Sequence, residues 1–178
     1  MITKIGIVSG QILELLDQNN GVLVFSQVHS NLKQSRDFIL MSLGWLLHKG
    51  YIHILENPST AACQDDDRNK AYTSEAGMSD LVIRNNMVRT YSKRIKNMPD
   101  HIAAVADKIL TLLDGCGNLL SLQSIESNLN EHRDIVLMGL GWLIREGYAL
   151  GIIGPQEIFI FRLPKKIANS KEESFSHM

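Results

Sequence analysis

The stretch RDFILMSLGWLLHKGY at residues 36–51 returns in similar form as RDIVLMGLGWLIREGY at residues 133–148. Displacing the chain by about 97 residues also aligns the flanking segments, residues 5–55 with residues 102–152, without a gap. Self-similarity over such a length is typical of a duplicated structural unit. The sequence therefore predicts two copies of one small fold.

Each copy begins with a predicted amphipathic helix. Apolar residues recur at helical spacing in residues 5–16 and 102–113, and Thr3 and Asp100 are the expected N-caps. A turn then leads to a short apolar strand at residues 22–25 or 119–122, and a short helix follows at residues 26–32 or 123–129. After a polar turn, a long helix runs to Gly50 or Gly147, where a left-handed residue is expected to end it.

A β-hairpin, or wing, is predicted after each long helix. In the second copy, apolar segments at residues 148–153 and 157–163 flank Gly154-Pro155-Gln156, which is a good turn sequence. In the first copy, a polar insert at residues 57–80 separates the strand at residues 51–55 from its expected return strand at residues 81–84. Residues 86–98 show a further helical pattern, which predicts a linker helix.

These elements predict an α+β chain, mainly α, with two tandem winged helix-turn-helix domains related by an internal repeat. We expect the first domain at residues 1–84, the linker helix at 85–98, the second domain at 99–164 and a polar tail at 165–178. The order of elements and the LGWL segment before Glu146-Gly147 resemble a small prokaryotic winged-helix family of uncharacterised function. The resemblance covers both copies, about two thirds of the chain. It implies DNA binding and transcription regulation by analogy of fold.

A DNA-binding winged helix places its long helix in the major groove and contacts phosphates with Lys and Arg. The net charge of this chain is −1, and residues 102–163 hold seven Asp and Glu against four Lys and Arg, so DNA would have to bind a local basic patch. Arg36 and Arg133 open the long helices, but each precedes an aspartate, and a local ion pair is the alternative expectation. Arg89, Lys93 and Lys96 form a basic stripe on the predicted linker helix. This stripe could contact phosphates, or it could be an ordinary solvated face. The candidate nucleic-acid-binding residues are Arg36, Lys49, Arg89, Lys93, Lys96, Arg133 and Arg145.

The outward side of each long helix is apolar in its middle. A helix that is apolar nearly all round is normally buried on both sides. The cover could be the wing, the other repeat, the linker helix or a second chain, so these residues are either core under the wing or an interface. The candidate interface residues are Phe38, Met41, Trp45, Ile135, Met138 and Trp142.

Catalytic and metal-binding patterns are not recognised in the sequence. The six His and two Cys fall in no ligand or nucleophile spacing, and no cofactor, metal or enzyme activity is expected. No apolar run is long enough to span a membrane and no signal sequence opens the chain, so a cytoplasmic protein without a membrane partner is expected. The function expected first is that of a non-enzymatic transcription regulator that binds double-stranded DNA. The alternative is a protein-interaction or assembly module whose apolar faces bind a protein partner or form a homodimer.

Overall fold

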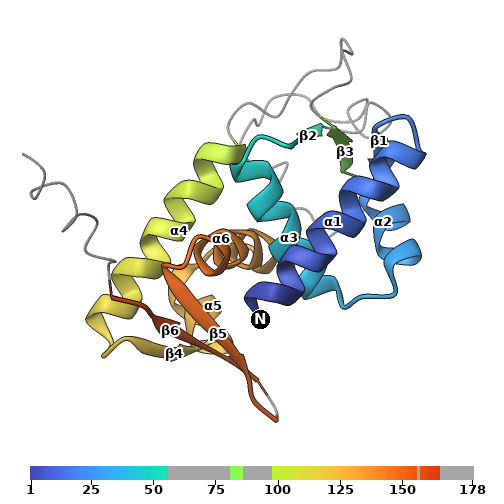
Figure 1. Ribbon diagram of the computed structural model, residues 1–178. Helices are drawn as coiled ribbons and strands as arrows, with labels where there is room; N and C mark the ends of the chain where they lie inside the picture. Colours follow the sequence, from blue (N-terminus) through green and yellow to red (C-terminus); the bar gives the residue numbers. More distant parts are fainter. Residues whose placement is uncertain (56–80, 86–97, 156, 165–178) are drawn as a thin grey trace, which may run out of the picture.

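The computed structural model describes residues 1–55, 81–85, 98–155 and 157–164. Over these residues the chain is α+β and mainly α, with six helices and two small antiparallel sheets of three strands each (Figure 1). We call residues 1–85 the first half and residues 98–164 the second half. The first half contains α1 (Ile2–Gln18), β1 (Val22–Val24), α2 (Phe25–Leu32), α3 (Arg36–His48), β2 (Ile52–Leu55) and β3 (Val82–Asn85). The second half contains α4 (Met98–Gly115), β4 (Leu119–Ser121), α5 (Leu122–Leu129), α6 (Arg133–Arg145), β5 (Ala149–Ile153) and β6 (Ile158–Arg162).

Each sheet is built within one half of the chain. The strand order is β1-β3-β2 in the first half and β4-β6-β5 in the second, so the last strand of each half lies in the middle of its sheet. The return strand expected at residues 81–84 is confirmed at Val82–Asn85, where Ile83 pairs with Leu23 on one side and Ile54 on the other. The hairpin expected in the second half is confirmed as the β5–β6 pair.

The long helices end as the sequence predicts. Gly50 and Gly147 have φ angles of 70° and 79°, in the left-handed region that favours glycine. The amide of Tyr51 donates across the glycine to the carbonyl of Leu46 at 2.9 Å, and the equivalent bond in the second half has the same length. This arrangement satisfies carbonyl groups that the end of a helix would otherwise leave unpaired, and it turns each chain directly into its sheet.

The first helix of each half begins earlier than predicted, so both expected N-caps are wrong. The amide of Ile5 bonds the carbonyl of Met1 at 3.1 Å, which places Thr3 inside α1. Asp100 lies in the first turn of α4, because Pro99 fits a first helical turn and the helix extends back to Met98. Within that turn the Asp100 carboxylate still interacts favourably with the helix dipole.

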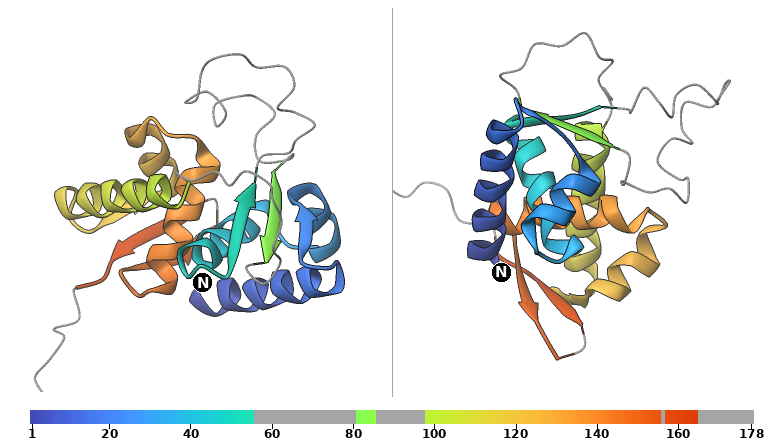
Figure 2. Two further views of the ribbon diagram at one scale, coloured as in Figure 1. Left: turned by 90° about the horizontal axis from the view of Figure 1, so that it is seen from above. Right: turned by 90° about the vertical axis from the view of Figure 1, so that its right-hand side faces the viewer.

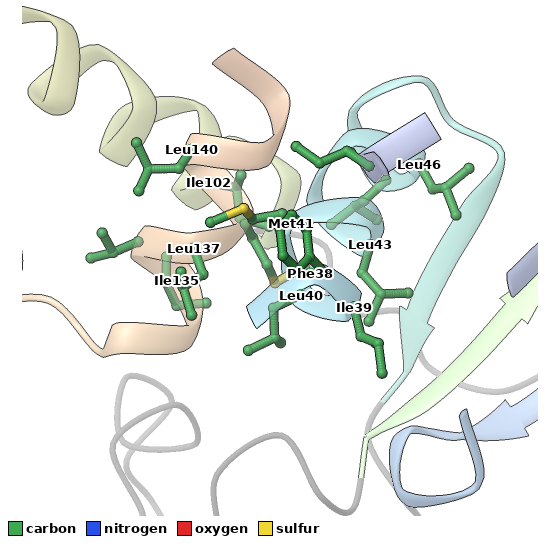
Figure 3. Packing of buried hydrophobic residues seen from close by; sticks show 14 of the residues in the cluster. Phe38, Ile39, Leu40, Met41, Leu43, Leu46, Ile102, Ile135, Leu137 and Leu140 are labelled. Carbon is green, nitrogen blue, oxygen red and sulfur yellow. The ribbon is translucent and has the colours of Figure 1, made fainter. Parts of the chain in front are cut away.

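The two long helices occupy the centre of the molecule. α1 covers α3 on one side and α4 packs against α6 on the other, while α3 packs more extensively against α6 than against α1 (Figure 2). Buried side chains from all four helices belong to one continuous hydrophobic cluster. Figure 3 shows part of it, with labelled residues from α3, α4 and α6. The core is therefore shared between the halves and does not stop at the boundary between them.

Three predicted segments lie outside the described residues. They are the insert at residues 57–80, the linker helix at residues 85–98 and the tail at residues 165–178. The ends of the predicted linker are the exceptions, since Asn85 ends β3 and Met98 opens α4. Among the helices that are described, none combines the length and the apolar character needed to cross a membrane.

Candidate functional site

The two long helices cross with their backbones in direct contact. A Cβ atom built on Gly44 would overlap the main chain of Met138, and one built on Gly141 would overlap the main chain of Met41. Every other residue type would place a carbon atom in space that the opposite backbone occupies, so glycine is required at both positions. The contact is reciprocal, because each glycine faces the methionine that precedes the other glycine by one helical turn. We call this contact the α3–α6 crossing.

Most of the predicted interface residues are buried at or beside this crossing. Met41 and Met138 are fully buried, while Phe38 is 6% exposed and Ile135 is 4% exposed. Figure 3 labels Met41, Phe38 and Ile135. The opposite long helix covers each methionine. Of the covers considered from the sequence, this is the one in the other half of the chain. Each such side chain contributes about 1.5–3 kcal/mol by leaving water. The crossing therefore holds the two halves together chiefly by apolar burial.

Trp45 and Trp142 lie half-buried at the rim of the crossing. The guanidinium of Arg145 lies 4.9 Å from the ring centroid of Trp45, and the ring of His48 stacks on Trp142 with centroids 3.9 Å apart. Each tryptophan therefore contacts the last turn of the opposite long helix. They are contact residues between the halves, and neither is a fully buried core residue of its own half.

The two tryptophans differ in their hydrogen bonds. Nε1 of Trp45 donates to Glu146 at 3.2 Å, whereas Nε1 of Trp142 is buried without a hydrogen-bond partner among the described residues. The position equivalent to Glu146 in the first half is Lys49, and an ammonium group cannot accept a hydrogen bond. Lys49 Nζ instead lies 2.9 Å from Glu146 Oε1, so the Glu146 carboxylate contacts both Trp45 and Lys49 at the end of α3.

The arginines that open the long helices pair across the halves. Arg36 Nη2 lies 2.6 Å from Asp134 Oδ2, and Arg133 Nη2 lies 2.9 Å from Asp37 Oδ2. Arg133 also pairs with Glu126. The expected local ion pairs are therefore wrong: adjacent residues of a helix point in different directions, and each arginine reaches the aspartate of the opposite helix instead.

Every described member of the predicted nucleic-acid-binding set contacts a partner within the chain. Arg36 and Arg133 pair with carboxylates, Lys49 pairs with Glu146, and Arg145 lies over the ring of Trp45. The other predicted members lie outside the described residues; they are Arg89, Lys93 and Lys96. The described cations thus stabilise the contact between the halves.

Acidification is expected to weaken the rim of the crossing in two stages. Burial lowers the pKa of His48, so the unfolded chain takes up this proton first and stability falls as the pH drops through the ordinary histidine range. Burial works to raise the pKa of Glu146, but hydrogen bonds from Lys49 and Trp45 outweigh it, and the pKa lies below its ordinary value. The Glu146 contribution is present above the ordinary carboxyl range and is lost as the pH falls towards the lowered pKa. Urea unfolding measured across pH should show both losses of stability. The loss at higher pH should be absent in His48→Gln, and the loss at lower pH should be reduced in Glu146→Gln. Identical profiles for the unchanged protein and both variants would contradict this expectation.

The outer face of the second sheet is mostly apolar and accessible. Directly opposite residues of antiparallel strands share a face, and the register aligns Phe161 with Leu119 and Leu150, and Phe159 with Ser121 and Ile152. Ser121 is polar, and its hydroxyl accepts a hydrogen bond from the Ser124 amide at the start of α5. The other five residues are apolar. The three aliphatic residues are exposed and the two phenylalanines are half-buried. None of these five residues is charged. We call this set the outer sheet face.

A small cavity of about 340 Å³ lies at one end of the second sheet, lined by Asp114, Asn118, Arg162, Leu163 and Pro164. Arg162 Nε donates to Asp114 at 3.0 Å, and its Nη1 donates to the carbonyl of Tyr148 at 3.0 Å. These contacts tie β6 to α4 and to the start of β5. No group of three His, Cys, Asp or Glu side chains that could hold a metal ion occurs in the part of the chain that the structure describes.

Comparisons of the chain with family models, with curated proteins and with solved structures found no match. Its function is therefore argued from its own residues. The features that sequence reasoning missed are the backbone contact at Gly44 and Gly141 and the crossed ion pairs. A signal for the first was present, because both copies carry glycine at the same place in a long helix, where glycine costs about 1 kcal/mol relative to alanine unless something requires it.

Proposed function

We propose that the chain is a non-enzymatic protein-interaction module built from two winged-helix units. In this proposal the long helices α3 and α6 join the units, and binding takes place on surfaces that the α3–α6 crossing leaves accessible. The partner is a protein that presents an apolar surface to the outer sheet face.

The observation that carries the proposal is the reciprocal burial of the two long helices. In a DNA-binding winged helix, the equivalent helix enters the major groove and its side chains contact base edges. Here Met41 and Met138 are fully buried between the helices, and Gly44 and Gly141 allow the backbones to touch. Neither helix can enter a groove by this side without first separating from the other.

The charges support the same choice. Phosphate contacts need accessible Lys or Arg side chains. Arg36, Arg133 and Lys49 instead pair with carboxylates of this chain. A duplex would have to compete with these internal partners for each of them.

The outer sheet face indicates the chemistry of the partner. Its members are apolar and uncharged, as in Leu150, Ile152 and Phe161, and such a surface gains nothing from a phosphate backbone. Contiguous exposed apolar surface on a folded protein commonly marks a protein-binding site. A protein surface with complementary apolar side chains is the occupant that this chemistry fits.

A DNA-binding transcription regulator is the second candidate. The observation that favours it is the order of elements, helix, strand, helix, helix, strand, strand, which occurs in both halves with the same strand order. This order is that of winged helix-turn-helix folds, many of which bind DNA. Phosphate contacts in this candidate would fall to Arg89, Lys93 and Lys96.

Fluorescence anisotropy with labelled mixed-sequence duplex DNA, titrated across salt, separates the two candidates. We expect weak binding that does not change when Arg89, Lys93 and Lys96 are all replaced by glutamate. Tight binding that weakens steeply with salt and collapses in the triple variant would favour the regulator and overturn our proposal.

A second arm tests the apolar face directly. A photo-crosslinking residue is placed at Ile152, and at Ile7 as a control, because both isoleucines are exposed and they lie in different halves. We expect a discrete protein adduct from position 152 alone, and weaker binding of that protein, once purified, to a Leu150→Ser/Ile152→Ser variant. Equal crosslinking from both positions would count against the outer sheet face.

A further inference from the structure

We infer that the α3–α6 crossing also forms between two copies of this chain when the crossing within each copy is weakened, with the first half of each copy packed on the second half of the other. The product is a dimer in which the halves are exchanged. This inference rests on the described contacts between the halves and does not depend on the proposed function.

The specific contacts of the crossing all join different halves. Gly44 meets Met138, Gly141 meets Met41, and Arg36 pairs with Asp134. The same holds for the further polar contacts, which are Arg133 with Asp37, Lys49 with Glu146, His48 with Trp142, and Arg145 with Trp45. A second copy can therefore supply every one of these contacts without any change in geometry.

Beside the crossing, α1 also contacts α6 and α3 contacts α4, and a second copy would supply these contacts in the same way. The other extensive contacts between elements lie within one half. Both sheets are formed from strands of a single half, and α1 with α2, or α4 with α5, pack within their own half. An exchanged dimer thus keeps each half intact and only changes which copy provides the opposite half. The covalent connection is residues 86–97, a length of chain that reaches at most roughly 40 Å.

The apolar character of the crossing explains why a second copy would be recruited. If the halves separate, Met41 and Met138 lose the cover of the opposite long helix, and the exposed apolar surface must be covered again. A short connection favours the half of the same copy, because it holds that half at an effective concentration on the order of millimolar. A second copy prevails when the internal crossing is impaired and the crossing between copies is not.

The ion pair of Arg36 with Asp134 allows this condition to be imposed. In Arg36→Asp, residue 36 faces Asp134 with the same charge, and in Asp134→Arg, residue 134 faces Arg36 with the same charge. Each variant alone therefore has a repulsive crossing, whether it closes internally or on its own copies. In an exchanged dimer of the two variants, one crossing brings the two substituted positions together with opposite charges, and the other carries the native Arg36 with Asp134. Both crossings are then attractive.

The experiment mixes the two purified full-length variants in equal amounts and follows mass by light scattering after size-exclusion chromatography. We expect a heterodimer of twice the 20.0 kDa chain mass, formed at least about tenfold more readily than a dimer of either variant alone, with a Tm above both. The mismatched control is Arg36→Asp mixed with Arg133→Asp, because exchange then gathers both repulsions in one crossing and relieves neither.

If either variant fails to fold, the pair Arg133→Asp and Asp37→Arg repeats the design at the other ion pair, which is more exposed. A mixture that stays monomeric with the Tm values of its separate components overturns the inference, as does equal dimer formation in the mismatched mixture. Neither result bears on the outer sheet face, so the failure of this inference and the failure of the proposed function can be told apart.

Discussion

Replacing Gly141 with alanine is expected to lower the free energy of unfolding by about 3 kcal/mol or more. The added Cβ would overlap main-chain atoms of Met41, which cannot move aside as the end of a flexible side chain could. The long helices would have to separate, and the buried apolar contacts between the halves would weaken with them. Gly44→Ala is expected to act alike, because its Cβ would overlap the main chain of Met138. Urea unfolding followed by circular dichroism measures both effects.

Two other helical glycines provide matched controls for this prediction. A Cβ added at Gly10 in α1 would meet no atom within 4 Å, so Gly10→Ala should stabilise the protein by about 0.5–1 kcal/mol through helix propensity. At Gly139 in α6 the nearest atom would be 3.4 Å away, an ordinary contact, and the change to alanine should have little effect. If Gly141→Ala is no more destabilising than Gly139→Ala, the long helices do not touch as described.

The strands and helix ends could be predicted because their signals are local. Alternating apolar residues and a turn sequence identified the β5–β6 hairpin, and the glycines at positions 50 and 147 identified the ends of the long helices. The return strand β3 was also found across the long insert, because Leu81, Val82 and Ile83 form a short apolar segment between polar residues. Such patterns depend on near neighbours in the chain and not on the tertiary arrangement.

The arrangement of the halves could not be predicted, because several covers suit the same apolar helix face. The pattern of Phe38, Met41 and Trp45 requires a partner on the outward side, but apolar burial is not directional and does not select one. Only Gly44 and Gly141 indicate which element covers this face. Glycine is unfavourable in a helix interior, and close approach of another backbone explains its presence there. The ion pairs were wrongly assigned for a related reason: proximity in sequence suggested local pairs, whereas the crossing brings the opposite aspartate within reach.

The crossed ion pairs lead to the second large effect that we expect. Asp134 lies in the first turn of α6 and is nearly buried, with 5% of its side chain exposed. It pairs with Arg36 of α3. Asp134→Ala should cost about 2 kcal/mol, because it removes the ion pair together with a carboxylate that favours the N-terminal end of a helix. Asp37 is more exposed, so Asp37→Ala should lower the free energy of unfolding by less, about 1 kcal/mol.

A double-mutant cycle distinguishes the crossed pairs from local ones, because a coupling energy isolates the interaction between two chosen side chains. Arg36→Ala and Asp134→Ala should couple by about 1 kcal/mol, a value kept modest because Arg36 is partly exposed. The neighbours Arg36 and Asp37 should couple weakly, by roughly 0.3 kcal/mol or less, although they adjoin in the sequence. The reverse order of the two couplings would mean that the arginines pair locally and that the ends of α3 and α6 do not meet. High salt should reduce the Arg36–Asp134 coupling less than that of Arg133 with Asp37, since burial of Asp134 limits screening.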